Sequence, residues 1–301
     1  MEIIRETNLG LGPMRRGKVR DCYDLDPYLL LVATDRMSAF DVVMPTGIPY
    51  KGKVLNSLSA FWFEKTAHIV ENHVVITDVE RIIQLYPGLA KWKDLLKGRT
   101  TLAKRASTVP VECVVRGYLA GSAHKEYANK GTVAEIAMPR GMKLSQKFDP
   151  PLFTPAIKAE TGHDENISIG KMKDIIGAEL AEKIIRTSLD LYNFAADYAS
   201  SRGILIADTK FEFGMLDGRL ILIDELFTPD SSRFWLSANY RPGENQQGFD
   251  KQPLRDWLEK LVAAGKWDKT PPGPQLPDDV VNYMSELYRK AFTMLTGEVI
   301  T

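Results

Sequence analysis

The alternation of apolar and polar residues is most regular in a short segment around residue 210. Residues 204–214 read Ile-Leu-Ile-Ala-Asp-Thr-Lys-Phe-Glu-Phe-Gly. Because successive side chains of a β-strand point to opposite faces, this segment would place Asp208, Lys210 and Glu212 on one face and mostly apolar residues on the other. A second run, residues 219–225, returns after a turn and predicts a β-hairpin.

The length of the turn determines where Asp224 lies in this hairpin. A two-residue turn at Asp217-Gly218 would put Asp224 on the apolar face. A three-residue loop, with its glycine in the left-handed conformation, would shift the register by one residue. Asp224 would then face Lys210 and lie diagonal to Glu212, within roughly 7–8 Å. The metal site considered next depends on this second register.

Two carboxylates at that separation, beside a lysine, repel each other unless a cation lies between them. A hard divalent ion with oxygen ligands, most simply Mg²⁺ bound to a nucleotide polyphosphate, fits such a gap. The alternative is a surface ladder of ion pairs on a half-buried hairpin, since charged cross-strand pairs are common. The geometry alone leaves both interpretations open.

The overall composition narrows the class of protein. A chain of 301 residues suggests about two domains and is long enough to bury large cores. Lysine plus arginine and aspartate plus glutamate number 39 each, so the net charge is zero. Because general nucleic-acid binding needs a basic surface, we expect no nucleic-acid partner. A local basic pocket for a small phosphorylated ligand is compatible with this balance.

The sequence favours a cytoplasmic location. No apolar run approaches the roughly 18 residues of a membrane span, so we expect no membrane partner, and the first residues do not read as a signal peptide. Cys22 and Cys113 are the only cysteines. Two isolated cysteines suit a reducing cytosol, and we interpret both as small apolar side chains in strands.

A glycine turn with flanking cations lies near the start of the chain. The segment Arg15-Arg-Gly-Lys-Val-Arg20 precedes an apolar run at residues 29–33. Such a turn can present backbone amides and cations to a phosphate. The segment is not a P-loop and lacks the Gly-x-Gly-x-x-Gly pattern. Taken alone, a solvated hairpin turn is the simpler interpretation.

A second informative stretch covers residues 108–122. Residues 111–115 are apolar apart from Glu112, which is typical of a buried strand. Arg116 follows, and Gly121-Ser122 comes shortly afterwards. A strand that ends in arginine near a Gly-Ser turn can hold an anion against a guanidinium and a hydroxyl. An ordinary strand-to-turn junction is the alternative.

Arg233 belongs to the loop that leaves the hairpin at Asp224. It can swing back toward the charged face of the hairpin and clamp a phosphate together with Arg116. The alternative is an exposed loop arginine.

Amphipathic helices are predicted from apolar residues at helical spacing. They cover residues 56–67, 178–201, 253–267 and 278–295. A stiff proline-rich linker at residues 271–277 precedes the last of them. We see no chemistry in these helices and interpret them as packing elements.

Together these segments resemble one family, phosphoribosylaminoimidazole-succinocarboxamide synthase, the SAICAR synthetase of purine biosynthesis. Residues 109–122 are similar to one signature of that family, and residues 205–214 are similar to another. Three further segments match in the same order: Gly17–Asp21, Asp35–Asp41, and Asp224-Glu225 with Ser231–Trp235. The extra loops and the C-terminal helix resemble the longer form of the family.

The resemblance implies an ATP-dependent carbon–nitrogen ligase. It would join L-aspartate to the carboxylate of carboxyaminoimidazole ribonucleotide (CAIR) and release SAICAR, ADP and phosphate. Because a carboxylate is a poor electrophile, transfer of the γ-phosphoryl group would first give an acyl phosphate, which the aspartate amine would attack. Such a scheme needs ATP, Mg²⁺ and donors for a ribonucleotide 5′-phosphate.

The resemblance also implies roles for individual residues. Lys210 would contact the reacting carboxylate or the γ-phosphate, and Asp208 would orient the imidazole nucleotide. The Mg²⁺ ligands would be Glu212 and Asp224. The phosphate of the ribonucleotide would be bound by Arg116, Gly121, Ser122 and Arg233. The substrate side would also be lined by Asp35, Arg36 and Ser38.

ATP would have its own set of contacts in this scheme. Its phosphates would be covered by Gly17, Lys18, Val19 and Arg20, with Lys104 as a further phosphate contact. The strand through Glu112 and Cys113 would offer backbone groups to the adenine, as the hinge of a kinase does.

The implied fold is α+β, with two lobes and ATP in the cleft between them. Residues 1–116 would form a mostly antiparallel N-terminal lobe, similar to the small lobe of a kinase. Residues 117–301 would form a C-terminal α/β lobe that ends in a helix after the linker at 271–277. The chain would act as a monomer or a homodimer.

Two other functions are compatible with parts of the pattern. A phosphotransferase acting on a hydroxyl would share the Mg²⁺ hairpin, but it should carry a catalytic base in a loop like His-Arg-Asp, which the sequence lacks. A non-catalytic nucleotide-binding module would need no lysine between its carboxylates. ADP release, measured with each substrate omitted in turn, distinguishes the three functions.

Overall fold

The computed structural model describes residues 2–157 and 165–300, and its fold is α+β, as predicted. The chain divides into two compact units. The first comprises Met1–Glu64, His73–Ala106 and Asp250–Thr301, and the second comprises Lys65–Asn72 and Ser107–Phe249. This division differs from the predicted boundary at residue 116, which falls inside a strand of the second unit. The C-terminal segment also belongs to the first unit rather than the second.

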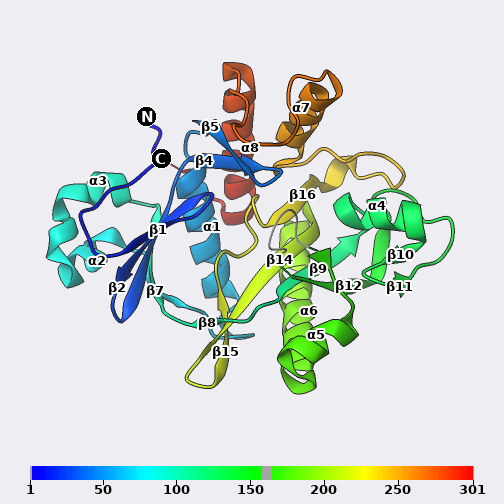
Figure 1. The fold of residues 1–301 in the computed structure, drawn as a ribbon, viewed down its shortest axis with the longest axis horizontal. Helices are drawn as coiled ribbons and strands as arrows, with labels where there is room; N and C mark the ends of the chain where they lie inside the picture. The colour runs from blue at the N-terminus through cyan, green and yellow to red at the C-terminus, as the bar shows by residue number, and fades with distance from the viewer. Residues whose placement is uncertain (1, 158–164, 301) are drawn as a thin grey trace. The chain divides into compact units, whose positions relative to one another are not determined.

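An antiparallel five-stranded sheet forms the centre of the first unit (Figure 1). Its order is β1 (Met14–Arg16), β2 (Arg20–Leu25), β3 (Tyr28–Ala33), β7 (Thr100–Lys104) and β6 (Val74–Ile76). One face packs against α2 (Val79–Leu85), η1 (Pro87–Trp92) and α3 (Lys93–Leu96). Leu30, Val32 and Leu102 of the sheet meet Ile82 and Leu89 there, and all five are fully buried.

The C-terminal helices pack within the first unit. Its other elements are β4 (Arg36–Ala39), β5 (Val42–Gly47), α1 (Lys51–Lys65), α7 (Gln252–Ala263) and α8 (Asp278–Thr296). Thr46 Oγ1 donates to Gln275 Oε1 at 2.8 Å, and Ser285 Oγ donates to the carbonyl of Pro49 at 2.9 Å. The sequence could not predict these contacts, because an amphipathic pattern shows that a helix has an apolar face but not what that face packs against.

The second unit is built on a seven-stranded sheet around its longest strand, β14 (Ile204–Leu216). The order is β13 (Glu165–Asn166), β12 (Lys147–Ile157), β9 (Glu112–Tyr118), β14 and β15 (Arg219–Ile223), with β8 (Ser107–Thr108) and β16 (Ser232–Leu236) also paired to β14. The first half of β14 pairs with β9 and β16, and its second half pairs with β15 and β8. This strand therefore gathers side chains from segments that are far apart in the sequence.

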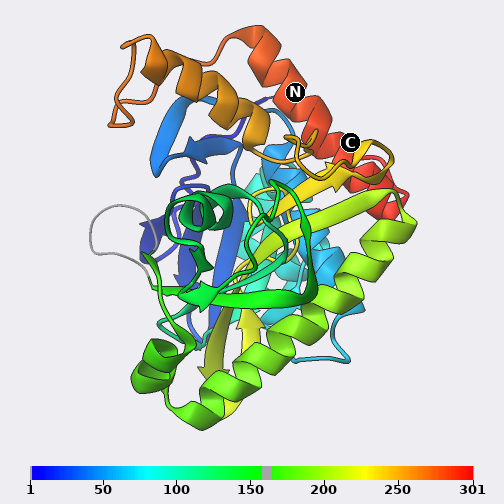
Figure 2. The same ribbon diagram turned by 90° about the vertical axis from the view of Figure 1, so that its right-hand side faces the viewer.

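Helix α6 (Ala178–Ser201) packs against β9 and β14 and covers one face of this sheet (Figure 2). Tyr192 of α6 donates from its hydroxyl to the carbonyl of Ile206 at 2.6 Å. A Cβ atom at Gly117 would lie 1.8 Å from that hydroxyl. Because Gly117 and Arg116 point to opposite faces of β9, α6 covers the face opposite to Arg116. The remaining elements of this unit are α4 (Gly121–Lys130), β10 (Thr132–Val133), β11 (Ile136–Ala137), α5 (Ile169–Ile176) and η2 (Ser237–Asn239).

A two-residue turn joins β14 to β15, and Leu216 pairs with Arg219. The φ angles are 49° at Asp217 and 75° at Gly218, which give the twist that such hairpins need. The predicted three-residue loop and its register are therefore wrong. Asp224 lies one residue beyond the end of β15 and has a φ of 68°. The backbone thus leaves the ladder there, and Asp224 takes neither of the two expected cross-strand positions.

Two findings concern membrane spans and cysteines. Within residues 2–157 and 165–300, no helix combines the length and the apolar character needed to cross a membrane.

Both cysteines are free thiols, with Cys113 buried and Cys22 partly buried. Burial raises the pKa of both thiols, which suits packing side chains rather than reactive groups.

Candidate active site

The charged face of β14 carries Asp208, Lys210 and Glu212, all partly buried, while the residues between them are buried. Lys210 Nζ donates to Glu112 Oε1 of β9 at 2.9 Å and to Glu212 Oε1 at 3.4 Å. The side chain of Lys210 is 33% exposed and that of Glu112 only 5%. The ammonium group therefore lies between carboxylates of two adjacent strands and keeps access to solvent.

Burial and acidic neighbours together set the charge of Lys210. Burial acts to lower the pKa of Lys210, but the charges of Glu112, Glu212 and Asp224, with the Glu112 hydrogen bond, raise it above its ordinary value. Lys210 is therefore a cation throughout the physiological pH range. The Asp224 carboxylate acts on this lysine although the hairpin does not pair the two residues.

Glu212 and Asp224 are the predicted magnesium ligands. Among the residues that the structure describes, no group of three or more histidine, cysteine, aspartate or glutamate side chains could hold a metal ion. At nucleotide sites Mg²⁺ usually needs one or two protein carboxylates, because water and phosphate oxygens complete its octahedron. Two carboxylates alone could therefore hold only an ion that arrives with a nucleotide, and not an ion that the protein binds by itself.

A second polar cluster is centred on Asp208, which pairs with Arg116 of β9 and Arg233 of β16 in the sheet. Arg233 forms an ion pair with Asp208 Oδ2, and Arg116 Nη1 lies 3.8 Å from the same oxygen. Arg116 also donates from Nε to Thr154 Oγ1 at 2.9 Å and from Nη2 to Ser122 Oγ at 3.3 Å. The structure thus brings Arg116, Ser122 and Arg233 together.

Close packing against Arg233 explains the glycine at position 121. Gly121 has a φ of 56°, and a Cβ atom there would lie 2.6 Å from Arg233 Nη2.

The charges of the Asp208 cluster do not cancel. Burial lowers the pKa of Arg116, while the charge of Asp208 opposes this effect. Asp208 contacts two guanidinium groups, so these three side chains together carry a positive charge that suits a bound phosphate.

In the first unit, the predicted phosphate loop is the turn between β1 and β2. Gly17 N donates to the carbonyl of Arg20 at 2.7 Å and closes the turn. Gly17 and Lys18 are exposed, while Val19 and Arg20 are half-buried. Lys18 Nζ forms an ion pair with Asp41. A ligand can therefore reach the tip of this turn, as the prediction requires.

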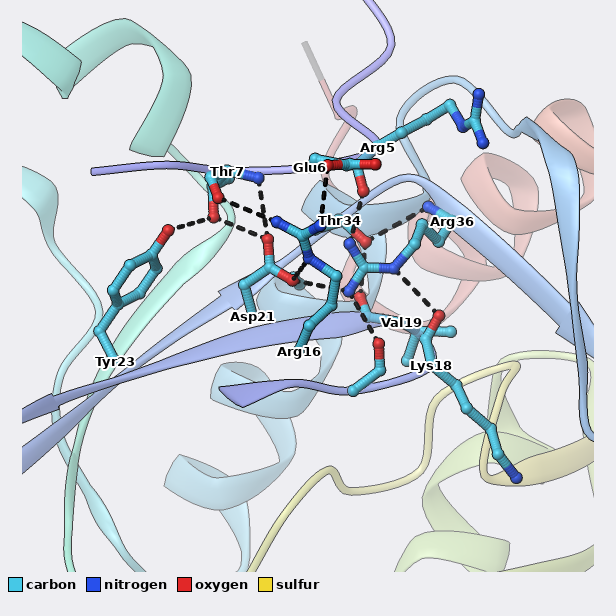
Figure 3. A network of polar contacts seen from close by, with 12 residues as sticks. Arg5, Glu6, Thr7, Arg16, Lys18, Val19, Asp21, Tyr23, Thr34 and Arg36 are labelled. Atoms are coloured by element: carbon cyan, nitrogen blue, oxygen red, sulfur yellow. Dashed lines mark hydrogen bonds and ion pairs between the residues drawn. The ribbon is translucent and has the colours of Figure 1, made fainter. Parts of the chain in front are cut away.

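Asp35 and Arg36, which are predicted to line the substrate side, form hydrogen bonds and ion pairs with the protein's own chain. Asp35 is fully buried and accepts from the amides of Ile4 at 2.8 Å and Gly52 at 2.9 Å, and it pairs with Arg99 at 3.2 Å. Arg36 is buried and donates to backbone carbonyls (Figure 3). These contacts satisfy polar groups that folding has removed from water.

The other predicted residues lie in strands. Ser38 is buried in β4, and Lys104 is half-buried at the end of β7. Glu112 and Cys113 begin β9, which runs between β12 and β14. The contact of the Glu112 side chain with Lys210 was missed, because only a backbone role was expected at this position. The available signal was a single acidic residue in an apolar strand.

Asp21 is a further residue that the sequence reasoning missed. Its fully buried carboxylate accepts from Thr7 N at 2.9 Å, from Thr7 Oγ1 at 2.7 Å and from Arg36 Nη2 at 2.8 Å (Figure 3). Asp21 and Tyr23 lie two residues apart on the buried face of β2. A lone carboxylate at an inward position of a strand was the signal that could have identified it.

Residues 13–272 match the sequence pattern of a protein family described as SAICAR synthetase. The chain belongs to the SAICAR synthetase family. A curated relative is the phosphoribosylaminoimidazole-succinocarboxamide synthase of Thermodesulfovibrio yellowstonii, which is 52% identical over 296 residues. The match covers 98% of this chain and 99% of the relative.

Solved SAICAR synthetase structures have the same fold. The SAICAR synthase of Saccharomyces cerevisiae, solved in complex with SAICAR, is 43% identical, with a TM-score of 0.89 and 99% of each chain covered. A SAICAR synthetase solved in complex with ADP is 22% identical, with a TM-score of 0.68 and coverage of 96% of this chain and 100% of that one, and it shares the fold. The family predicted from residues 109–122 and 205–214 is confirmed.

Proposed function

We propose that the chain catalyses the ATP-dependent ligation of L-aspartate to the carboxylate of CAIR, giving SAICAR, ADP and phosphate in de novo purine biosynthesis. The observation that carries this proposal is the position of Lys210 between Glu112 and Glu212, on the same face of β14 as the Asp208 cluster. Family membership and the near-complete match to a curated relative support the same reaction. The two related structures contain SAICAR and ADP, which are products of this reaction.

The proposed chemistry has two steps. A carboxylate oxygen of CAIR attacks the γ-phosphorus of ATP, and the bond from that phosphorus to the β–γ bridging oxygen breaks, which gives ADP and an acyl phosphate. The amine nitrogen of aspartate then attacks the acyl carbon, phosphate leaves, and the amine loses a proton as the amide forms. The first step places charge on the transferred phosphoryl group and on the departing oxygen of ADP, and the second places it on the oxygen of the tetrahedral intermediate and on the departing phosphate. A fixed cation beside the reacting carboxyl group therefore lowers the barriers. Lys210 supplies this cation.

The Asp208 cluster binds the ribonucleotide in this scheme. Arg116, Ser122 and Arg233 donate charge-assisted hydrogen bonds to its 5′-phosphate. Asp208 holds the two guanidinium groups in place before the ligand arrives, so less side-chain freedom is lost on binding, and it orients the imidazole nucleotide. The lack of a side chain at Gly121 leaves room for Arg233.

The ATP contacts are proposed separately for each unit. In the first unit, the exposed turn Gly17–Arg20 binds phosphate groups, with Lys104 as a further cation. In the second unit, the backbone of β9 at Glu112 and Cys113 contacts the adenine. Glu212 and Asp224 would hold a Mg²⁺ ion, which neutralises phosphate charge during phosphoryl transfer when it is bound.

ADP release with substrates omitted in turn tests the reaction. We expect release only when ATP, aspartate and CAIR are all present, or a single turnover without aspartate if the acyl phosphate forms first. Sustained ADP release with CAIR alone would indicate a phosphotransferase. Absence of release with all three substrates would leave only a nucleotide-binding function.

The metal role is tested by Glu212→Gln, which keeps the size of the side chain and removes its charge. We expect turnover to fall about 100-fold and the Mg²⁺ concentration for half-maximal activity to rise. Glu71→Gln is the matched control, because Glu71 is an exposed glutamate of the same unit that pairs with Arg219. Normal turnover and normal Mg²⁺ dependence in Glu212→Gln would refute the metal role.

A further inference from the structure

Arg36 holds two consecutive carbonyl groups of the turn between β1 and β2 (Figure 3). Its Nη2 donates to the carbonyl of Gly17 at 2.9 Å, and its Nε donates to the carbonyl of Lys18 at 3.1 Å. The Arg36 side chain is 6% exposed, and Asp21 balances its charge at 2.8 Å. Its Nη1 donates to the carbonyl of Arg5. One buried guanidinium therefore joins the turn to the N-terminal segment.

The next two carbonyl groups of the turn are also bound by the protein. The carbonyl of Val19 accepts from Thr34 N at 3.0 Å and from Thr34 Oγ1 at 2.8 Å. The carbonyl of Arg20 accepts from Gly17 N at 2.7 Å. All four carbonyl oxygens of the exposed turn thus point toward donors of the chain itself.

Peptide geometry gives this arrangement a consequence for the amide groups. In a trans peptide, the C=O of one residue and the N–H of the next point in opposite directions, and the cis peptides of the described chain are all X–Pro bonds elsewhere. Because the carbonyls of Gly17 and Lys18 face Arg36, the N–H groups of Lys18 and Val19 face away from it. Successive N–H groups of this kind form an anion-binding concavity, whereas carbonyl oxygens on that side would repel a phosphate.

We propose that Arg36 and Thr34 are positioning residues, which fix the Gly17–Arg20 turn so that its amides face the phosphate groups of ATP. This inference rests on the proposed function, in which the turn contacts these phosphates. Arg36 is buried and acts through the backbone that it holds. Arginine suits this role because its planar fork reaches two carbonyls and a carboxylate at once, whereas lysine donates from a single nitrogen.

The test compares the affinities for ATP and for adenosine, measured by calorimetry, in the wild type and in Arg36→Lys. The turn contributes only to phosphate binding, so the dissociation constant of ATP should rise about tenfold or more, while that of adenosine stays unchanged. Thr34→Val removes one hydroxyl and keeps the side-chain shape. It should weaken ATP binding by about threefold, again without an effect on adenosine.

Arg99→Lys is the matched control. Arg99 is a buried arginine of the same unit that donates to the carbonyl of Ala33 and pairs with Asp35, so its substitution reproduces the loss of a buried guanidinium that makes no hydrogen bond to the turn. We expect it to keep the wild-type ratio of ATP to adenosine affinity. The positioning role is refuted if Arg36→Lys weakens the binding of ATP and of adenosine equally. It is also refuted if Arg99→Lys changes the ratio of the two affinities as much as Arg36→Lys does.

Two further outcomes are decisive. If Arg36→Lys does not fold, Thr34→Val decides, and an unchanged ratio in that variant refutes the proposal. If the wild type itself binds ATP no more tightly than adenosine, the phosphate role of the turn in the proposed function fails. If the wild type binds ATP more tightly than adenosine, and Arg36→Lys and Thr34→Val keep the same ratio of affinities, only the positioning role is refuted.

Discussion

The Asp21–Arg36 pair of the first unit and the Asp208 cluster of the second use the same two kinds of side chain in different ways. Arg36 donates to backbone carbonyls and to Asp21, and the pair is almost completely buried. Asp208 is shared by Arg116 and Arg233 and keeps 13% of its side chain exposed. Arg16 also pairs with Asp21, at 3.3 Å, but it pairs with Glu6 as well, at 2.8 Å, so the charges of the first unit are matched. In the second unit, the two guanidinium groups on one carboxylate leave a surplus of positive charge that can bind an anion.

This difference shows that burial alone does not identify a functional charge. A buried group whose hydrogen bonds end on the chain itself supports the backbone. A group with excess charge and access to solvent is available to a ligand. Lys210 belongs to the second class, because it is 33% exposed and its carboxylate neighbours, which keep it a cation, outnumber it. The following predictions test this distinction, from the largest expected effect to the smallest.

Asp21→Ala should have the largest effect, and it should act on stability. Removing one partner of a buried pair leaves the other charge uncompensated, so we expect the free energy of unfolding to fall by about 3–5 kcal/mol, measured by urea denaturation. Arg219→Ala is the control, because Arg219 and Glu71 form an exposed pair, and it should cost less than about 1 kcal/mol. If the free energy of unfolding fell as little in Asp21→Ala as in the control, the Asp21–Arg36 pair would not be needed to stabilise the first unit.

Lys210→Met should act mainly on turnover. We expect kcat to fall about 10²–10³-fold, the usual cost of losing one group that stabilises developing charge. Lys210→Arg keeps the charge beside Glu112 and serves as the folding control, although the wider guanidinium should also lower kcat. Thermal unfolding of both variants separates folding from catalysis. Retention of wild-type kcat in Lys210→Met would place the reaction elsewhere.

Arg116→Ala should act on binding. The loss of hydrogen bonds from a charged donor should raise the KM for CAIR about 10–100-fold, with little change in the KM for ATP. Steady-state kinetics with each substrate varied in turn measures this difference. If the KM for ATP rose and that for CAIR did not, the assignment of the two sites would have to be exchanged.

The raised pKa of Lys210 predicts a small and specific pH dependence of stability. A lysine of the unfolded chain titrates at about 10.4, and Lys210 in the folded chain titrates higher. The stabilisation by its acidic neighbours is therefore fully present below the unfolded-state pKa and is lost as pH rises through the folded-state pKa. The difference in unfolding free energy between wild type and Lys210→Met should stay constant up to about pH 10 and narrow above it. A difference that already narrows around neutral pH would contradict the raised pKa.

Much of the local structure could be predicted from the sequence. The period-two pattern correctly placed Asp208, Lys210 and Glu212 on one face, because a strand alternates its side chains whatever its neighbours are. The predicted helix over residues 178–201 matches α6, since a long apolar stripe at helical spacing specifies both type and extent. The position of Asp224 was predicted wrongly, because an Asp-Gly dipeptide is compatible with more than one turn.

The roles of Asp35 and Arg36 show a different limit. A family motif identified these residues, but it does not say whether a polar side chain points to a ligand or into the chain. The direction of such a side chain depends on which backbone groups lose their contact with water during folding and need a hydrogen-bond partner. Here the N-terminal segment and the turn at Gly17 supply those groups.

By itself, the sequence determined the family, the main helices and the face of β14 on which its charged residues lie. Only the tertiary structure decided that Lys210 meets Glu112, that Arg116 and Arg233 share Asp208, and that α8 packs within the first unit. The physical reason is that periodicity depends on the geometry of one segment alone. The choice of a partner strand depends on hydrogen bonds and packing between segments, which here join residues 98 positions apart.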